Sequence, residues 1–62
     1  MCLSTAYEVG NGSDKFICDR VTNVSVDGNN VKLLTLLGIE TVVTGKLASV
    51  DLERNIIKIE TK

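Results

Sequence analysis

Residues 22–33, with the sequence TNVSVDGNNVKL, decide the fold class of this chain. Valine alternates with polar residues as far as Val26, which is the period-2 pattern of a strand with one buried face. The four residues that follow, Asp27-Gly28-Asn29-Asn30, are typical of a turn between two strands. We expect the apolar run after them, residues 31–37, to be a strand. Asn30 could instead cap a helix of about two turns there, but an isolated helix of that length is marginal.

Similar patterns extend in both directions from this hairpin. Alternating or β-branched segments recur along the chain, and turn residues separate them about every eight to twelve positions. These turn signals are Gly10–Asp14, Gly38, Gly45 and Glu53–Asn55. The connections are too short for the crossover that a parallel pair needs, so we expect antiparallel hairpins throughout. The sequence therefore predicts an all-β fold, a small antiparallel β-barrel of about six short strands that forms a single domain over residues 1–62.

One segment does not follow a simple alternation. The apolar residues Ile17, Val21 and Val24 do not share one period-2 register. An extra residue in one strand would shift the register in this way and bend the strand. We therefore expect a bulge or bend near Asp19-Arg20.

The composition argues against several classes of function. The 62-residue chain has a formal net charge of −1, one tyrosine and one phenylalanine, whereas nucleic-acid-binding domains are usually basic and carry aromatic stacking platforms. It has no histidine, and hence no imidazole for a Ser-His or Cys-His nucleophile, so we expect it not to be an enzyme. No signal peptide and no apolar stretch of roughly 20 residues is visible, so we expect a cytoplasmic protein without a membrane span.

Cys2 is the residue whose position indicates a chemical role. A small second residue commonly permits removal of Met1, which would leave Cys2 with a free α-amine beside its thiol. The two groups form a five-membered N,S chelate, and a divalent ion of borderline softness displaces both of their protons near neutral pH. Two such chelates supply the N2S2 set that suits square-planar Ni(II) or Cu(II), with one chelate from each of two chains. The alternative is that Cys2 is only a small apolar residue at the start of a strand.

Cys18 is the other candidate ligand. If the first hairpin turns around residues 11–13, Cys18 lies across from Ala6, on the same face as Cys2. It then lies about four residues along from Cys2, roughly 13 Å at the rise of a strand. A disulfide needs Cα atoms within about 7 Å of each other, and a cytoplasmic compartment keeps thiols reduced. We therefore interpret Cys18 as a structural residue.

A series of short motifs runs along nearly the whole chain: Met1-Cys2, Ser4, Ala6-Tyr7, Asp19, Val21, Gly28, Val31-Lys32-Leu33, Leu37-Gly38, Glu40, Val43 to Leu47, Val50-Asp51-Leu52 and Ile57 to Glu60. On these residues the chain resembles the CooT-like family of small nickel-binding proteins. That family includes an accessory protein of carbon monoxide dehydrogenase maturation, and its members are often labelled as predicted RNA-binding proteins. The chain departs from the family pattern by placing Ile39 between Gly38 and Glu40, and by adding Cys18.

The resemblance implies a small SH3-like or Sm-like β-barrel that dimerises and binds nickel through the cysteine at position 2, here Cys2. The function that we expect is that of a homodimeric nickel-binding accessory protein or metallochaperone, which serves a nickel enzyme such as carbon monoxide dehydrogenase. One alternative is an RNA-binding barrel, which the slightly acidic charge disfavours. The other is a non-catalytic module that docks on a larger enzyme through a sheet edge or an apolar patch.

Overall fold

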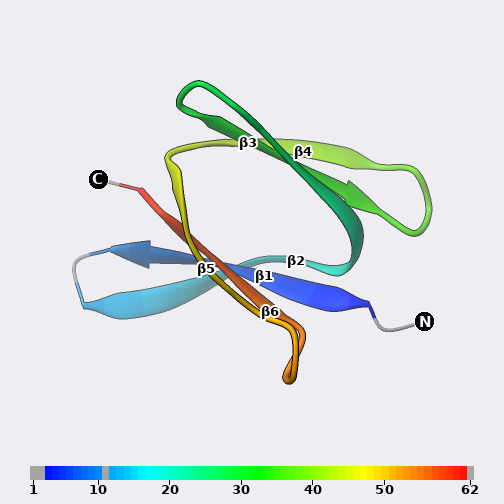
Figure 1. Cartoon of the computed structure of the whole chain (residues 1–62), viewed down its shortest axis with the longest axis horizontal. Helices are drawn as coiled ribbons and strands as arrows, with labels where there is room; N and C mark the ends of the chain where they lie inside the picture. The colour runs from blue at the N-terminus through cyan, green and yellow to red at the C-terminus, as the bar shows by residue number, and fades with distance from the viewer. Residues whose placement is uncertain (1–2, 11, 62) are drawn as a thin grey trace.

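Six β-strands form one curled sheet in the computed structural model of this protein, which describes residues 3–10 and 12–61 (Figure 1). The strands are β1 (Ser4–Gly10), β2 (Ser13–Asp27), β3 (Asn30–Thr35), β4 (Glu40–Thr44), β5 (Lys46–Asp51) and β6 (Ile56–Glu60). Their order across the sheet is β4-β3-β2-β1-β6-β5. The prediction of a small all-β fold with about six strands is confirmed. Residues 31–37 form strand β3 and the turn after it, so the helical alternative is wrong.

The pairing of β1 with β6 corrects the expectation of antiparallel hairpins throughout. These two strands run parallel, with Thr5 opposite Ile56 and Val9 opposite Glu60. The other four pairs of neighbouring strands are antiparallel. The reasoning from short connections holds only for strands that follow each other in the chain. The connection between β1 and β6 is the whole of the intervening sheet, which is long enough for a parallel pair.

The turns are tighter than the sequence indicated. The residues Gly10 and Asp14, expected to lie in a loop, instead belong to β1 and β2, and Gly10 pairs with Ser13. In the next hairpin Asp27 pairs with Asn30, and Gly28 between them has a φ of 60°. A left-handed conformation of this kind is what a two-residue hairpin turn requires, and glycine adopts it without steric cost.

Strand β2 bends near Asp19-Arg20, as the broken apolar register predicted. The pairing with β1 shifts there, because Ala6 lies opposite Cys18 while Ser4 lies opposite Val21. Arg20 has a φ of 56°, which is uncommon for a residue with a side chain. Because of the bend, the first half of the long strand β2 pairs with β1 and its second half pairs with β3.

The core lies on the concave side of the curled sheet and is built from aliphatic side chains on four strands. Val31 and Leu33 of β3 alternate with exposed Lys32, as the period-2 pattern predicted. Ile57 and Ile59 of β6 are buried as well and alternate with half-buried Lys58. The buried set is Ala6, Val21, Val31, Leu33, Ile57 and Ile59.

Strands β4 and β5 are consecutive in the chain, yet each lies at an edge of the sheet, and Gly45 lies between them. The Gly45 amide donates a hydrogen bond of 2.7 Å to the carbonyl oxygen of Asn29. On its other side Gly45 lies so close to β6 that a Cβ atom would overlap the carbonyl oxygen of Glu60. Gly45 therefore joins the two edges of the sheet at a point where a larger residue does not fit.

Within residues 3–10 and 12–61, no helix has the length and apolar character needed to cross a membrane.

Candidate functional site

Cys2, the predicted nickel ligand, lies outside the described residues, so the site is defined here by what surrounds the start of β1. Ser4 is paired with Val21, directly after the bend of β2. The amide of Thr5 donates a hydrogen bond of 2.9 Å to the carbonyl oxygen of Asn55 in the turn between β5 and β6. The start of β1 is therefore fixed on both sides, by the bend of β2 and by the β5–β6 turn.

The turn between β3 and β4 lies close to the same end of the sheet (Figure 1). Val21 pairs with Ser4 on one side and with Thr35 on the other. The start of β1 and the end of β3 are thus two strand spacings apart, or about 10 Å. The Leu36 amide extends this contact by donating a hydrogen bond of 2.8 Å to the carbonyl oxygen of Arg20. Any group bound at the start of β1 has the β3–β4 turn as its neighbour.

Cys18 lies opposite Ala6, as the hairpin register predicted. Its half-buried side chain packs against the aliphatic core, and the thiol is free. Burial raises the pKa of the Cys18 thiol above its ordinary value, and the neighbouring Asp19 carboxylate raises it further. The thiol is therefore held in its protonated form, which is a poor metal ligand and a poor nucleophile.

The raised pKa of Cys18 predicts a specific pH dependence. Alkylation of Cys18 by iodoacetamide should be slow at neutral pH and should reach half its maximum rate above pH 9.0, the ordinary thiol value. The raised pKa of Cys18 also affects stability. As the pH rises, the unfolded chain loses the Cys18 proton before the folded chain does, so the free energy of unfolding falls between the pKa of the unfolded chain and the pKa of the folded chain. Peptide mass spectrometry of the alkylated protein measures this rate separately for each cysteine. The urea-unfolded chain is the control, and a midpoint at or below that of the unfolded chain would contradict the prediction.

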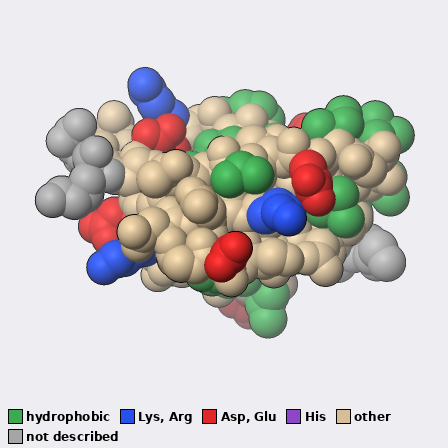
Figure 2. Space-filling model, turned by 90° about the horizontal axis from the view of Figure 1, so that it is seen from above, with side chains coloured by type: hydrophobic (Ala, Val, Ile, Leu, Met, Phe, Trp, Pro, Cys, Tyr) green, Lys and Arg blue, Asp and Glu red, His purple; other side chains and the backbone are tan. Residues whose placement is uncertain are grey.

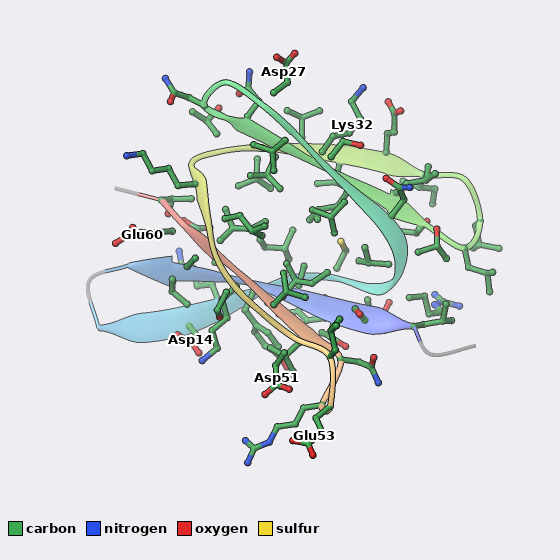
Figure 3. All side chains as sticks on the ribbon, in the orientation of Figure 1. Asp14, Asp27, Lys32, Asp51, Glu53 and Glu60 are labelled. Atoms are coloured by element: carbon green, nitrogen blue, oxygen red, sulfur yellow. The ribbon has the colours of Figure 1, made fainter. Side chains whose placement is uncertain are left out.

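The described carboxylates are dispersed over the sheet and its turns. Asp14, Asp27, Asp51, Glu53 and Glu60 point outward from different parts of the sheet (Figure 3). Among the residues that the structure describes, no group of three or more His, Cys, Asp or Glu side chains could hold a metal ion together. Some carboxylates instead form exposed ion pairs that contribute little to stability. Examples are the pair of Lys58 with Asp14, at 3.5 Å, and the pair of Lys32 with Glu40, at 3.9 Å.

The two aromatic side chains lie together on the outer face of the sheet. Tyr7 of β1 pairs with Phe16 of β2, and their rings meet edge to face with centroids 6.2 Å apart. Phe16 is 60% exposed, and Lys58 lies beside Tyr7 on the parallel neighbour β6. Such a cross-strand pair stabilises a sheet by itself. It is also the feature of the described residues most similar to a base-stacking platform.

The surface formed by the described residues is hollowed at the Gly45 connection and beside the bend of β2. The first hollow, of about 440 Å³, is lined by Asn29, Thr44, Gly45, Lys46 and Glu60. The second, of about 160 Å³, has Cys18 and Thr41 among its lining residues. This second hollow borders the end of the sheet at which β1 begins, because Arg20 and Leu36 also line it.

Sequence reasoning did not distinguish the leucines around Thr35. The run from Leu33 to Leu37 is the most apolar stretch of the chain, and its first leucine is fully buried. Leu36 and Leu37, however, are 57% and 69% exposed, because β3 ends at Thr35 and the chain turns. Gly38, which the sequence marked as a break, is the signal that could have placed these two leucines in a turn.

Comparisons with known proteins agree with this architecture. The crystal structure of "putative CooT from Carboxydothermus hydrogenoformans" superimposes with a TM-score of 0.87 at 20% sequence identity, covering 98% of each chain. At that identity the similarity demonstrates a shared fold. No curated protein sequence matches this chain. The sequence model of CooT, described as a CO dehydrogenase accessory protein, matches residues 1–60. With this match over nearly its whole length, the chain belongs to the CooT family of CO dehydrogenase accessory proteins.

Proposed function

We propose that this protein binds Ni(II) through the thiolate of Cys2 and acts, as a homodimer, in supplying nickel to an enzyme such as carbon monoxide dehydrogenase. The family match carries the proposal, because it covers residues 1–60 and so includes the cysteine at position 2. The accessory role of the family supports a non-catalytic protein, and the cytoplasm is the compartment in which we expect it to act. Nickel is the cargo in this proposal rather than a resident cofactor.

The donor chemistry supports Cys2 over the other side chains. A thiolate is a soft anionic ligand that suits Ni(II), whereas carboxylates favour harder cations. The chain has no histidine to compete, and its other cysteine is Cys18, which burial and the Asp19 charge keep protonated. A single cysteine per chain cannot fill a square-planar coordination sphere, so two chains would each contribute Cys2.

Native mass spectrometry of untagged protein with and without Ni(II) tests this proposal directly. We expect a dimer that takes up one Ni(II) per two chains, because each chain supplies one Cys2 thiolate. The same spectra report whether Met1 has been removed and its amine freed. A protein that stays metal-free with excess Ni(II) present at pH 7.5 would contradict the proposal.

RNA binding is the second candidate function, and the pair of half-buried Tyr7 with exposed Phe16 is the observation that favours it. A chain of net charge −1 displaces few counterions from a phosphate backbone, so the electrostatic part of the affinity is missing. We therefore expect a dissociation constant weaker than about 100 μM for single-stranded RNA at physiological salt. Fluorescence polarisation with labelled RNA measures it. Salt-resistant binding in the submicromolar range that Phe16→Ala abolishes would make RNA binding the leading function.

A further inference from the structure

The hollow at the Gly45 connection, here called the Gly45 hollow, is a feature of the surface that the proposed nickel site does not use. Its volume of about 440 Å³ lies in the range of small-molecule pockets. It lies at the end of the sheet where β1 finishes, because its lining residue Glu60 is paired with Val9. Val9 lies four residues along β1 from Thr5, or about 13 Å. A ligand in this hollow is therefore remote from the start of β1.

The backbone around the Gly45 hollow is held in place by close contacts. The Gly45 amide donates to the carbonyl oxygen of Asn29 at 2.7 Å, and Gly45 lies directly against the backbone of Glu60. These contacts join the β2–β3 turn, the end of β4 and the end of β6 around one residue. The hollow is therefore formed before a ligand arrives, and its backbone needs no rearrangement on binding.

Two side chains of opposite charge line the Gly45 hollow. Lys46 begins β5 and Glu60 ends β6, and the two residues lie directly opposite each other. Opposite charges at such cross-strand positions commonly form a pair. Neither of these two side chains, however, belongs to an ion pair with a described residue. An ammonium group and a carboxylate group are thus both available to a ligand at one hollow.

Uncharged polar groups complete the lining of the hollow. The side-chain amide of Asn29 can both donate and accept hydrogen bonds. The Thr44 hydroxyl donates to Oδ1 of Asn30 at 3.3 Å, so its oxygen keeps a lone pair with which to accept. The hollow therefore offers donor groups from Lys46 and Asn29. Its acceptors come from Glu60 and Thr44.

The charges at the Gly45 hollow select the class of ligand. A simple anion would be attracted by Lys46 but repelled by Glu60, and a simple cation would meet the reverse. Figure 2 shows acidic and basic side chains interspersed on the face in view, with no large area of one sign that would favour a highly charged ligand. A small molecule that carries one positive and one negative charge matches both side chains. The chemistry of the lining thus favours a zwitterion.

We propose that the Gly45 hollow binds a free α-amino acid by its head group, which is the ammonium and the carboxylate on its α-carbon. The carboxylate accepts hydrogen bonds from the Lys46 ammonium and the Asn29 amide. The ammonium donates to the Glu60 carboxylate and the Thr44 hydroxyl. A residue inside a peptide does not fit, because its amino and carboxyl groups are uncharged amides. The lining side chains are exposed, so the side chain of the amino acid points to solvent and different amino acids bind alike.

Titration of the metal-free protein with glycine tests the site, because glycine is the head group without a side chain. We expect saturable shifts in the backbone amide signals of the residues that line the hollow, followed by two-dimensional NMR of ¹⁵N-labelled protein. The dissociation constant should be about 1 mM, since both ion pairs are open to solvent. Alanine should bind equally well. A spectrum that glycine leaves unchanged at about 50 mM, far above that constant, would overturn the proposal.

Ligands that lack one of the two charges test the assignment to a zwitterion. Acetate keeps only the carboxylate, and methylamine keeps only the ammonium. Each should bind at least about tenfold more weakly than glycine, because it loses a charge-assisted hydrogen bond. Acetate or methylamine that bound as tightly as glycine would show a site for a simple ion, and that result would overturn the proposal.

Lys46→Gln and Glu60→Gln test the two charged residues. Both side chains are exposed, so the fold should persist, and far-UV circular dichroism checks it. Each variant should bind glycine about tenfold more weakly than the parent chain. The matched controls are Lys32→Gln and Glu53→Gln, which remove the same charges at exposed positions outside the lining and should bind normally. Binding by Lys46→Gln and Glu60→Gln at the strength of the parent chain would overturn the assignment.

The amino-acid proposal and the nickel proposal fail in different experiments. Metal-free Cys2→Ala should bind glycine as the parent chain does, because the Gly45 hollow lies at the other end of β1. Lys46→Gln should likewise bind Ni(II) as the parent chain does. Loss of glycine binding in folded Cys2→Ala would overturn the placement of the amino acid in the Gly45 hollow.

Discussion

Replacing Cys2 by alanine is expected to abolish tight Ni(II) binding, whereas replacing Cys18 by alanine should leave it nearly unchanged. Alanine donates no electron pair, and serine, the closest alternative, keeps a hydroxyl that stays protonated near neutral pH. The control variant, Cys18→Ala, removes a thiol that burial and the Asp19 charge already hold in its protonated form. Titration with Ni(II), followed by the charge-transfer absorbance of the nickel thiolate, measures both variants against the parent chain.

Acid should have the same effect as the Cys2 substitution. Protons compete with the metal for a thiolate, so the apparent affinity of the parent chain should fall steadily as the pH decreases from 8 to 6. The Cys2→Ala chain should show weak binding at each pH. If Cys2→Ala bound Ni(II) as tightly as the parent chain, the nickel function would lose its chemical basis, because no histidine is present to replace the thiolate.

Gly45→Ala should destabilise the fold more than any other single methyl addition at a described glycine. The new Cβ would overlap the carbonyl oxygen of Glu60 and would lie 3.1 Å from Cγ2 of Thr61. The glycine cannot move away freely, because its amide is bonded to Asn29. Overpacking against a backbone atom costs about 3 kcal/mol, which is a large part of the stability of a domain of this size. Urea unfolding followed by circular dichroism measures the loss.

Gly28→Ala is the control for Gly45→Ala. A methyl group at Gly28 would meet no heavy atom within 4 Å, and the cost comes only from its positive φ of 60°. That cost is about 1 kcal/mol. If Gly28→Ala and Gly45→Ala lowered the urea midpoint by the same amount, close packing of the β4–β5 connection against β6 would not be the reason for a glycine there.

Local patterns predicted the hairpins of this fold well. The position of Cys18 opposite Ala6 follows from counting residues back from the first turn. The bend at Asp19-Arg20 follows from apolar side chains that change register, since each of them must still face the core. Both results depend only on residues within one hairpin, where the sequence pattern and the turn together determine the register.

Features that depend on distant residues were not predictable in this way. The parallel pairing of Thr5 with Ile56 joins opposite ends of the sheet, and no local pattern indicates it. Gly45 has the same appearance in the sequence as Gly28, but its role comes from close packing against Glu60. For the candidate site, the sequence predicted Cys2 and its chemistry. It did not predict that the β3–β4 turn would lie beside the start of β1, because that proximity is set by the bend of β2.

The parallel pair of β1 and β6 has a consequence for the order of events during protein synthesis. Strand β1 leaves the ribosome first. While the chain grows, β2 can pair with β1, β3 with β2 and β4 with β3, each as a hairpin. The second neighbour of β1, strand β6, is made only after five other strands. Closing a contact between distant parts of a chain is slow, so the last step of folding should occur after β6 has emerged. Until then the amide of Thr5 does not make its hydrogen bond to the carbonyl oxygen of Asn55. The start of β1 therefore reaches its final geometry only after β6, the last strand in the chain order, has joined the sheet.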